Sequence, residues 1–224
     1  MRAAVVLPAG GAGLRMGTGG VRKQYAELAG EPILRRSMGP FLERRDVEWV
    51  VAVLPAEDVE DPPFRLPDGV VVVAGGPERG DSVRHGLDAV PAAADVVLIH
   101  DAARPLVSGA VIDRVLRAVG PDVGAVAALP VADTLKEVAD GRITRTVDRS
   151  TLWRAQTPQG FPRPMIVDAY RRAAEEGVRA TDDAALVERF GGRVVVVQGD
   201  PRNLKITRPE DLRLAELLLA EAGR

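Results

Sequence analysis

Short apolar runs alternate with amphipathic stretches along most of this chain, and this alternation limits the folds that it can adopt. The apolar runs lie at 3–7, 49–54, 70–74, 95–99, 124–129 and 193–197. The amphipathic stretches lie at 32–44, 78–90, 108–119, 164–176, 182–190 and 208–222. Strands that alternate with helices form a mostly parallel sheet covered by helices on both faces. We therefore predict an α/β fold with a Rossmann-like sheet, in which Ser108 and Thr207 cap two of the helices.

The pattern changes between residues 132 and 150. Residues 134–138 and 143–147 alternate in side-chain character, and Asp140-Gly141 between them is typical of a hairpin turn. A lone hairpin is marginally stable in water, so we expect this arm to pack on a second subunit. The sequence thus predicts one domain over residues 1–224, with a protruding β-hairpin arm at about 132–150 that makes a homodimer.

Bulk composition excludes several classes of protein. The chain has 224 residues, a net charge of −2 at pH 7 and no cysteine. The length suits one domain with a sizeable core, and the near-neutral charge argues against general nucleic-acid binding. The absence of cysteine excludes disulfides, zinc–thiolate sites and a cysteine nucleophile. No apolar run is long enough to span a membrane, and the first run is a poor signal peptide, so we expect a cytoplasmic enzyme without a membrane partner.

A glycine-rich loop follows the first apolar run. Gly10, Gly11 and Gly13 lie within four positions, and Arg15 and Lys23 come soon after. Glycines let a backbone turn sharply and bring its N–H groups close to an anion. The two cations supply positive charge where such a loop would hold a phosphate chain. The pattern predicts a nucleoside triphosphate site, and a turn that only connects strand to helix is the alternative.

Two well-known glycine motifs do not fit this loop. A Walker loop needs Gly before the lysine and Ser or Thr after it, and Lys23 has neither. A dinucleotide loop needs G-x-G-x-x-G, but here Gly17 arrives one residue late. Glu31, at about the distance of the ribose-binding acid, lies in a predicted turn and not at a strand end. A redox enzyme with a dinucleotide site is therefore disfavoured.

Lysine is rare in this chain. It occurs only at positions 23, 136 and 205, so 27 of the 30 basic residues are arginine. Lysine is a compact charge on a flexible stem, whereas arginine is a wide planar fork. A lysine that persists against such a bias is a candidate for a role that arginine cannot fill, and the alternative is chance.

Two further motifs follow predicted strands. The segment from Gly75 to Val83 joins a strand to a helix, and its paired glycines let the backbone approach a base or ribose. Asp101 follows the run at 95–99, and a carboxylate at a strand end is well placed to hold Mg²⁺. Arg104 can instead pair with Asp101 and make that motif structural. We interpret His100 as a buried structural histidine and His85 as a helix-surface residue.

Nine segments, in a fixed order, carry a resemblance to a known family. They are PAGGAGLRM, RKQY, GGPERGDSV, HDAARP, PVADTLK, TVDRSTLW, AQTPQGF, ATDDAA and NLKITRPEDL. The set resembles the 2-C-methyl-D-erythritol 4-phosphate cytidylyltransferase family from the first strand to the last helix. This resemblance implies a nucleotidyltransferase that moves CMP from CTP to 2-C-methyl-D-erythritol 4-phosphate and releases pyrophosphate. It places the product, 4-diphosphocytidyl-2-C-methyl-D-erythritol, in non-mevalonate isoprenoid precursor biosynthesis.

The resemblance also implies roles for individual residues. Arg15 and Lys23 stabilise the α-phosphate, while Arg149 and Lys205 act on the phosphate of the second substrate. The residues implied at CTP are Ala9, Gly10, Gly11, Gly13, Gly76, Ser82, Asp101 and Ala102. Those implied at the polyol phosphate are Thr134, Arg104, Thr157 and Thr181. In the family, Thr134 and Arg149 come from the partner subunit, and Asp101 is the candidate Mg²⁺ ligand beside CTP.

The chain departs from the family pattern at two positions, and two rival functions stay open. Leu14 and Arg22 stand where the family often has arginine and proline. The nearest rival is a cytidylyltransferase for another polyol phosphate, such as ribitol 5-phosphate. A rival of another class is a non-catalytic sensor that binds CTP, and the presence of all four implied catalytic cations argues against it.

Overall fold

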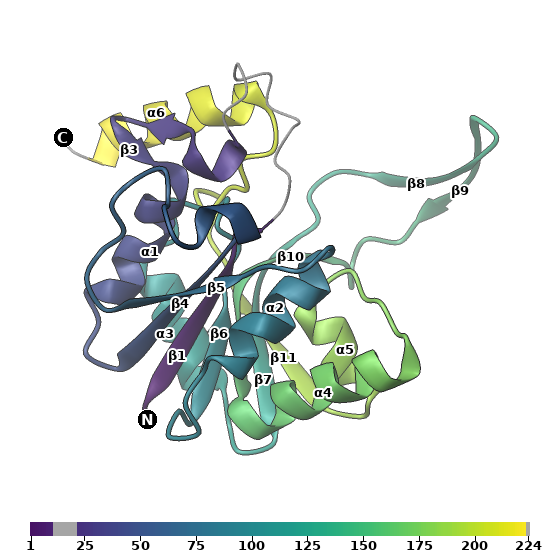
Figure 1. Ribbon diagram of the computed structural model, residues 1–224. Coiled ribbons are helices and arrows are strands. Elements are labelled where there is room, and N and C mark those ends of the chain that lie inside the picture. Colours follow the sequence, from purple (N-terminus) through teal and green to yellow (C-terminus); the bar gives the residue numbers. More distant parts are fainter. Residues whose placement is uncertain (11–21, 223–224) are drawn as a thin grey trace.

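The computed structural model describes residues 1–10 and 22–222. A seven-stranded sheet runs through the centre of the molecule, and Figure 1 shows its place among the helices. The order across the sheet is β11–β7–β10–β6–β1–β4–β5. The strands are β1 (Ala3–Pro8), β4 (Val47–Leu54), β5 (Val70–Ala74), β6 (Val96–Ile99), β7 (Val123–Pro130), β10 (Trp153–Pro162) and β11 (Arg193–Gln198). All run in one direction except β10, which is antiparallel to both of its neighbours. The predicted mostly parallel α/β sheet is confirmed.

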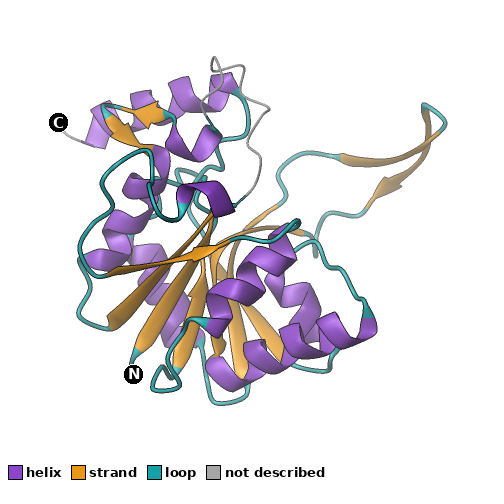
Figure 2. Ribbon diagram, in the orientation of Figure 1, coloured by secondary structure: helices purple, strands orange, loops and turns teal. Residues whose placement is uncertain are grey.

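Helices cover both faces of this sheet (Figure 2). The helices on its faces are α1 (Ile33–Leu42), α2 (Arg79–Asp88), α3 (Gly109–Ala118), α4 (Arg163–Glu176) and α5 (Asp183–Arg189), whereas α6 (Pro209–Ala222) packs in a third, smaller cluster with Leu28 and Ile206. Apolar side chains of α1 and α3 pack in one core cluster, and those of α2, α4 and α5 pack in a second. The sheet separates the two clusters, as the alternation of strands and helices in the sequence predicts.

Strand β1 shows why its sequence must be apolar throughout. Ala3, Val5 and Leu7 belong to one core cluster, while Ala4 and Val6 belong to the other. Successive side chains of a strand point to opposite faces, so a strand with helices on both sides has no face left for solvent. All five side chains are fully buried.

The sequence analysis did not recognise β10, although this strand lies in the middle of the sheet. Gln159 pairs with Ile99 of β6 and with Val126 of β7. The register shifts between Ala155 and Gln159, a stretch that contains Pro158. Proline has no N–H for the ladder, and the segment lacks an alternating apolar pattern, so local sequence gives no strand signal.

The two predicted helix caps differ from the structure in their hydrogen bonds. Ser108 occupies the position before α3, but its side chain makes no capping hydrogen bond. At α6 the cap comes from within the helix, because the Asp211 carboxylate accepts from the backbone N–H groups of Thr207 and Arg208. The Thr207 hydroxyl also donates to this carboxylate at 2.8 Å. An acid in the first turn thus binds the two residues before the helix, and the Thr207 hydroxyl donates to it where a cap would accept from a helix N–H.

Strands β8 (Leu135–Ala139) and β9 (Arg142–Val147) pair antiparallel and project away from the sheet (Figure 1). Asp140 has a positive φ of 50°, and Gly141 follows with 75°, as a tight hairpin turn requires. Leu135, Val138 and Ile143 are exposed on this arm.

On the opposite side of the molecule, a two-stranded sheet of β2 (Glu27–Leu28) and β3 (Glu31–Pro32) packs near α6. None of the helices in the described residues is both long and apolar enough to cross a membrane.

Candidate active site

A cavity of about 220 Å³ opens where β1, β5 and β6 end, and it gathers most of the predicted nucleotide-binding residues. Its wall is formed by Pro8, Ala9, Gly10, Lys23, Gln24, Gly76, Pro77, Glu78, Arg79, Ser82, Asp101, Ala102, Ala103 and Lys205. Ligands of α/β sheets bind outside the carboxyl ends of the strands, because the connecting loops converge there. Segments from five separate parts of the sequence meet at this place.

Glycines allow the loops after β1 and β5 to touch. A Cβ on Gly10 would lie 3.3 Å from the Gly75 Cα, and one on Gly75 would lie 2.9 Å from the Ser82 Oγ. The Gly76 N–H donates to the Ser82 hydroxyl at 3.2 Å, and this hydroxyl donates to the Glu78 carbonyl at 3.1 Å. A side chain at either glycine would push these loops apart, so the glycines keep backbone groups at the cavity wall.

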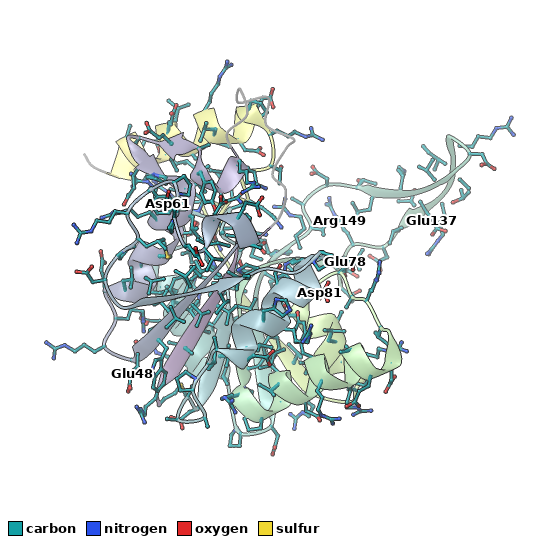
Figure 3. All side chains as sticks on the ribbon, in the orientation of Figure 1. Glu48, Asp61, Glu78, Asp81, Glu137 and Arg149 are labelled. Atoms are coloured by element: carbon teal, nitrogen blue, oxygen red, sulfur yellow. The ribbon has the colours of Figure 1, made fainter. Side chains whose placement is uncertain are left out.

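The start of α2 is fixed by a reciprocal cap. Glu78 precedes the helix, and its backbone N–H donates to the Asp81 carboxylate at 3.2 Å. The Glu78 side chain in turn accepts from the backbone N–H of Asp81, which completes a capping box. Both labelled side chains lie at the beginning of α2 in Figure 3. The cap holds this turn, with Ser82 in it, against the cavity.

Asp101 is surrounded by three cations from distant parts of the chain. Lys205 Nζ lies 2.9 Å from its Oδ2, Arg104 Nε lies 3.5 Å from the same oxygen, and Arg79 Nη2 lies 3.5 Å from Oδ1. Burial alone would raise the pKa of Asp101, but these positive charges outweigh it and hold the pKa well below its usual range. Asp101 is therefore an ionised carboxylate whose two oxygens both face cations.

This charge arrangement does not fit a metal ion held by the protein alone. A magnesium ion prefers one or two carboxylates that are free to coordinate it. Within residues 1–10 and 22–222, no group of three or more His, Asp or Glu side chains could hold a metal ion. Asp101 would bring a divalent cation next to three positive side chains.

The segment that carries Lys205 is tied to the loop after β6. Ile206 N–H donates to the Ala103 carbonyl at 2.8 Å, and Arg104 Nη1 donates to the Asn203 carbonyl at 2.8 Å. Burial lowers the pKa of Arg104, and the Asp101 carboxylate counteracts this shift. Arg104 is 9% exposed and absent from the cavity wall. Its contacts support the structural interpretation, in which it pairs with Asp101 and holds Lys205 in place.

His100 is a buried structural residue, as predicted from the sequence. Its ring is fully buried beside Phe41, with a centroid distance of 5.0 Å. Nε2 lies 3.1 Å from the Arg104 carbonyl, and Nδ1 lies 3.1 Å from the Thr157 hydroxyl. Burial lowers the pKa of His100 to about 4, so the ring is neutral at physiological pH. Thr157 also accepts from the Asp101 N–H at 2.9 Å, which places it behind the cavity wall.

Arg79 is a cavity residue that the sequence analysis did not single out. It binds Asp183 through both terminal nitrogens, at 3.0 and 2.8 Å, and the Tyr170 hydroxyl donates to the same carboxylate. Asp183 is fully buried, and such a paired arrangement is the usual way to bury a charge. The Arg79–Asp183 contact links residues 104 positions apart, so only the fold reveals it. A second cavity, of about 330 Å³, lies between α2, α4 and α5 and shares Glu78 and Arg79 with the first.

Among the remaining predicted site residues, none that the structure describes lines the cavity. Gly11, Gly13 and Arg15 lie outside the residues that the structure describes. Thr181 is exposed between α4 and α5. Thr134, just before β8, and Arg149, just after β9, are both exposed at the base of the arm. Arg149, labelled in Figure 3, donates to the carbonyl of Ala132.

The fold and the cavity together define a class of protein. An α/β sheet whose glycine-rich turns and lysines meet at the carboxyl ends of the strands is the architecture of a nucleotide-binding enzyme. A profile of the family described as "IspD: 2-C-methyl-D-erythritol 4-phosphate cytidylyltransferase" matches residues 3–221. The chain belongs to this family.

Known proteins resemble the chain over nearly its whole length. It is 46% identical to the 2-C-methyl-D-erythritol 4-phosphate cytidylyltransferase of Symbiobacterium thermophilum, over 98% of this chain and 94% of that protein. It is 47% identical to the bifunctional enzyme IspD/IspF of Rhodospirillum rubrum, covering 99% of this chain and 58% of that protein. The crystal structure of the cytidylyltransferase from Thermus thermophilus matches with a TM-score of 0.82 and 35% identity, over 98% of this chain and all of that one.

Proposed function

We propose that this protein transfers CMP from CTP to 2-C-methyl-D-erythritol 4-phosphate. An oxygen of the substrate phosphate forms a bond to the α-phosphorus of CTP, the bond to the β-phosphate oxygen breaks, and pyrophosphate leaves. The products are 4-diphosphocytidyl-2-C-methyl-D-erythritol and pyrophosphate. The observation that carries the proposal is the convergence of Lys23, Lys205, Gly76 and Ser82 on one cavity in a chain of this family.

The chemistry of this transfer suits the residues of the cavity. Both reacting groups are anionic phosphates, so the protein must neutralise charge and align them, with little covalent work to do. The phosphate nucleophile is already ionised near neutral pH and needs no strong base. Lys23 is proposed to stabilise charge on the α-phosphate, together with Arg15. Lys205, which Asp101 holds at 2.9 Å, is proposed to orient the incoming phosphate.

Magnesium enters this proposal with CTP. The phosphate oxygens of a nucleotide are good ligands for Mg²⁺, whereas the oxygens of Asp101 already face three cations. Direct coordination of this Mg²⁺ by Asp101, together with the phosphates of CTP, stays a prediction.

A homodimer that shares its sites is part of the same proposal. Arg149 is exposed at the base of the arm, and it is absent from the wall of the cavity in its own chain. The arm also exposes Leu135, Val138 and Ile143, which a second copy of the chain could cover. In this arrangement Thr134 and Arg149 of one subunit serve the cavity of the other. A cytoplasmic location is proposed from the substrates, both of which are soluble metabolites.

The test is pyrophosphate release, measured with CTP and Mg²⁺ across a panel of polyol phosphates. We expect the highest kcat/KM with 2-C-methyl-D-erythritol 4-phosphate. Faster turnover of ribitol 5-phosphate would favour the rival cytidylyltransferase. Tight CTP binding without turnover of any acceptor would favour the non-catalytic sensor.

A further inference from the structure

Lys23 lies at the cavity, and the residues on either side of it in the chain, Arg22 and Tyr25, both bind the carboxylate of Asp58. Arg22 forms ion pairs with both Glu57 and Asp58. On the other side, the Tyr25 hydroxyl donates to the Asp58 Oδ2 at 2.7 Å. Asp58 thus accepts from residues immediately before and two positions after Lys23. Glu57 and Asp58 belong to a short 3-10 helix, Ala56–Asp58, which follows β4.

The backbone around Lys23 is fixed from a second direction as well. Residues Lys23–Tyr25 form a 3-10 turn, in which the Tyr25 N–H donates to the Arg22 carbonyl at 2.9 Å. The buried Gln24 side chain donates to the Ala9 carbonyl at 2.8 Å, at the end of β1. Strands β1 and β4 are neighbours in the sheet. The turn that carries Lys23 is therefore attached to the ends of two adjacent core strands.

The Asp58 contacts are partly shielded from water. Its side chain is 17% exposed, against 63% for Glu57. Solvent screens an exposed ion pair strongly, and a half-buried carboxylate with two donors is held more firmly. Burial and the Asp58 hydrogen bond together raise the pKa of Tyr25, so its hydroxyl remains a donor at physiological pH. The Tyr25 ring packs edge-on against Phe64, which restricts it further.

We propose that Asp58 is a positioning residue for Lys23, and that it acts by clamping Arg22 and Tyr25. The inference rests on the proposed function, in which the Lys23 ammonium meets the triphosphate. Lysine has a long flexible stem, so the protein must fix its starting point if the charge is to be in place before the reaction. Asp58 does this without lining the cavity itself.

The first test is the Asp58→Ala variant, assayed by pyrophosphate release. A misplaced charge of this kind costs on the order of 10- to 100-fold, and we expect that loss in kcat/KM for CTP. Asp58→Asn can still accept from Tyr25 but loses the charge that pairs with Arg22, so its loss should be intermediate. Tyr25→Phe removes one hydrogen bond and should lose only a few-fold, and it remains informative if Asp58→Ala does not fold.

Glu48→Gln provides a matched control. Glu48 accepts from Arg2 at 2.7 to 3.0 Å, so it is also a carboxylate paired with arginine, and it also belongs to the β4 region. Figure 3 shows Glu48 at the end of the molecule opposite Asp61, which lies three residues beyond Asp58. We expect near-wild-type activity from Glu48→Gln. Equal losses at Asp58 and Glu48 would mean that any lost ion pair lowers activity, and would contradict the proposal.

The decisive test is a double-mutant cycle with Lys23→Ala. If Asp58 acts through Lys23, then Asp58→Ala should cost less than about twofold when Lys23 is already absent. A merely structural role would lower activity by the same factor in both backgrounds, and that result would overturn the proposal. Where turnover of Lys23→Ala is too slow, the same cycle is measured on the Kd for CTP.

Failure of this inference differs from failure of the proposed function. Wild-type protein that binds CTP without transferring CMP would contradict the function and leave the cycle on CTP affinity as the test of Asp58. An active wild type with equally active Asp58→Ala would contradict only the positioning role. Each variant is assayed at a temperature where circular dichroism shows it to be folded.

Discussion

Two of the three lysines of this chain stand at the cavity, and each reaches it by different means. Lys23 lies on a turn attached to β1 and β4, and Lys205 lies on a segment attached to the loop after β6. Lys136 is on the arm, where its ammonium donates to the Thr146 hydroxyl at 2.7 Å. The rarity of lysine in the sequence therefore coincides with a position at the cavity in two cases of three.

Conservative replacement of these lysines should be damaging. If each is a compact charge on a phosphate, Lys23→Arg and Lys205→Arg should lose about 10²–10³ in kcat, because the wider fork cannot take the same place. Steady-state pyrophosphate release measures the loss. Lys136→Arg is the control and should keep wild-type kcat. Near-normal turnover in both cavity variants would indicate that lysine occurs at these two positions by chance.

Neutral His100 makes stability depend on pH in a defined window. The pKa of His100 is about 4 in the folded chain and 6.5 without burial. Between these values the unfolded chain binds a proton that the folded chain excludes, so the free energy of unfolding falls as pH drops from 6.5 to 4 and His100 adds no further loss below that. The shift corresponds to a loss on the order of 3 kcal/mol.

Urea unfolding at about pH 7 and about pH 4.5 measures the effect of His100. The His100→Gln variant should be less stable at neutral pH, since a buried hydrogen-bonded ring is lost, yet its stability should change less between the two pH values. Other titrating groups contribute to both proteins alike. An identical pH dependence in the variant would show that His100 is not the group responsible.

At the scale of elements, the turn between β5 and α2 is shaped by close backbone approach. A Cβ on Gly76 would lie 2.3 Å from the Asp81 Cβ, a distance that side chains do not tolerate. Four positions on, a Cβ on Gly80 would meet nothing within 4 Å. Position 76 therefore requires glycine for steric reasons, whereas position 80 has room for a side chain.

The Gly76→Ala variant should distort this turn and weaken CTP binding. We expect kcat/KM for CTP to fall by about tenfold or more, because the displaced Asp81 would pull the cap of α2 and Ser82 away from the nucleotide. Gly80→Ala should stay close to wild type in the same assay. A comparable loss in both variants would point to helix-start flexibility in place of a steric requirement.

The same turn should select the base. The backbone of Gly76 lines the cavity and can face the edge of the pyrimidine, where cytosine carries an amino group and uracil a carbonyl. A site that pairs with one edge leaves groups unpaired with the other, so we expect kcat/KM to favour CTP over UTP by at least about 100-fold. Competition between the two nucleotides in one assay measures the ratio. Equal use of both would contradict a base-reading role for this turn.

At the scale of the whole molecule, the arm is the feature that the body of the protein does not explain. Arg149 and the exposed apolar side chains of β8 and β9 project from a sheet that is already covered by helices on both faces (Figure 1). Subunit complementation tests the proposed shared site. Arg149→Ala and Lys23→Ala should each be nearly inactive alone.

Mixed and refolded together, the two variants should regain activity. Half of the dimers would be mixed, and each mixed dimer would hold one site with both defects and one with neither. Recovery of about a quarter of wild-type sites is expected. If heterodimers are demonstrated by mass and activity does not return, Arg149 serves its own subunit and the shared-site proposal fails.

The sequence could predict the strands, helices and turns, and also that the loops after the parallel strands meet at one edge of the sheet. The apolar β1 run, helical spacing and glycine turns are set by neighbouring side chains, so they are readable without a structure. Because the carboxyl ends of parallel strands meet at one edge, residues such as Gly76 and Asp101 could be expected at the same cavity. The resemblance to a family then added roles that no spacing could supply.

Only the tertiary structure decided the remaining features, since each depends on partners far apart in the chain. Strand β10 forms because β6 and β7 offer it two ladders, although the segment around Pro158 has no strand pattern of its own. Asp101 faces three cations, and Asp58 clamps Arg22 from 36 residues away. Charge pairing over such separations leaves no local signal, because the fold alone brings the partners within reach.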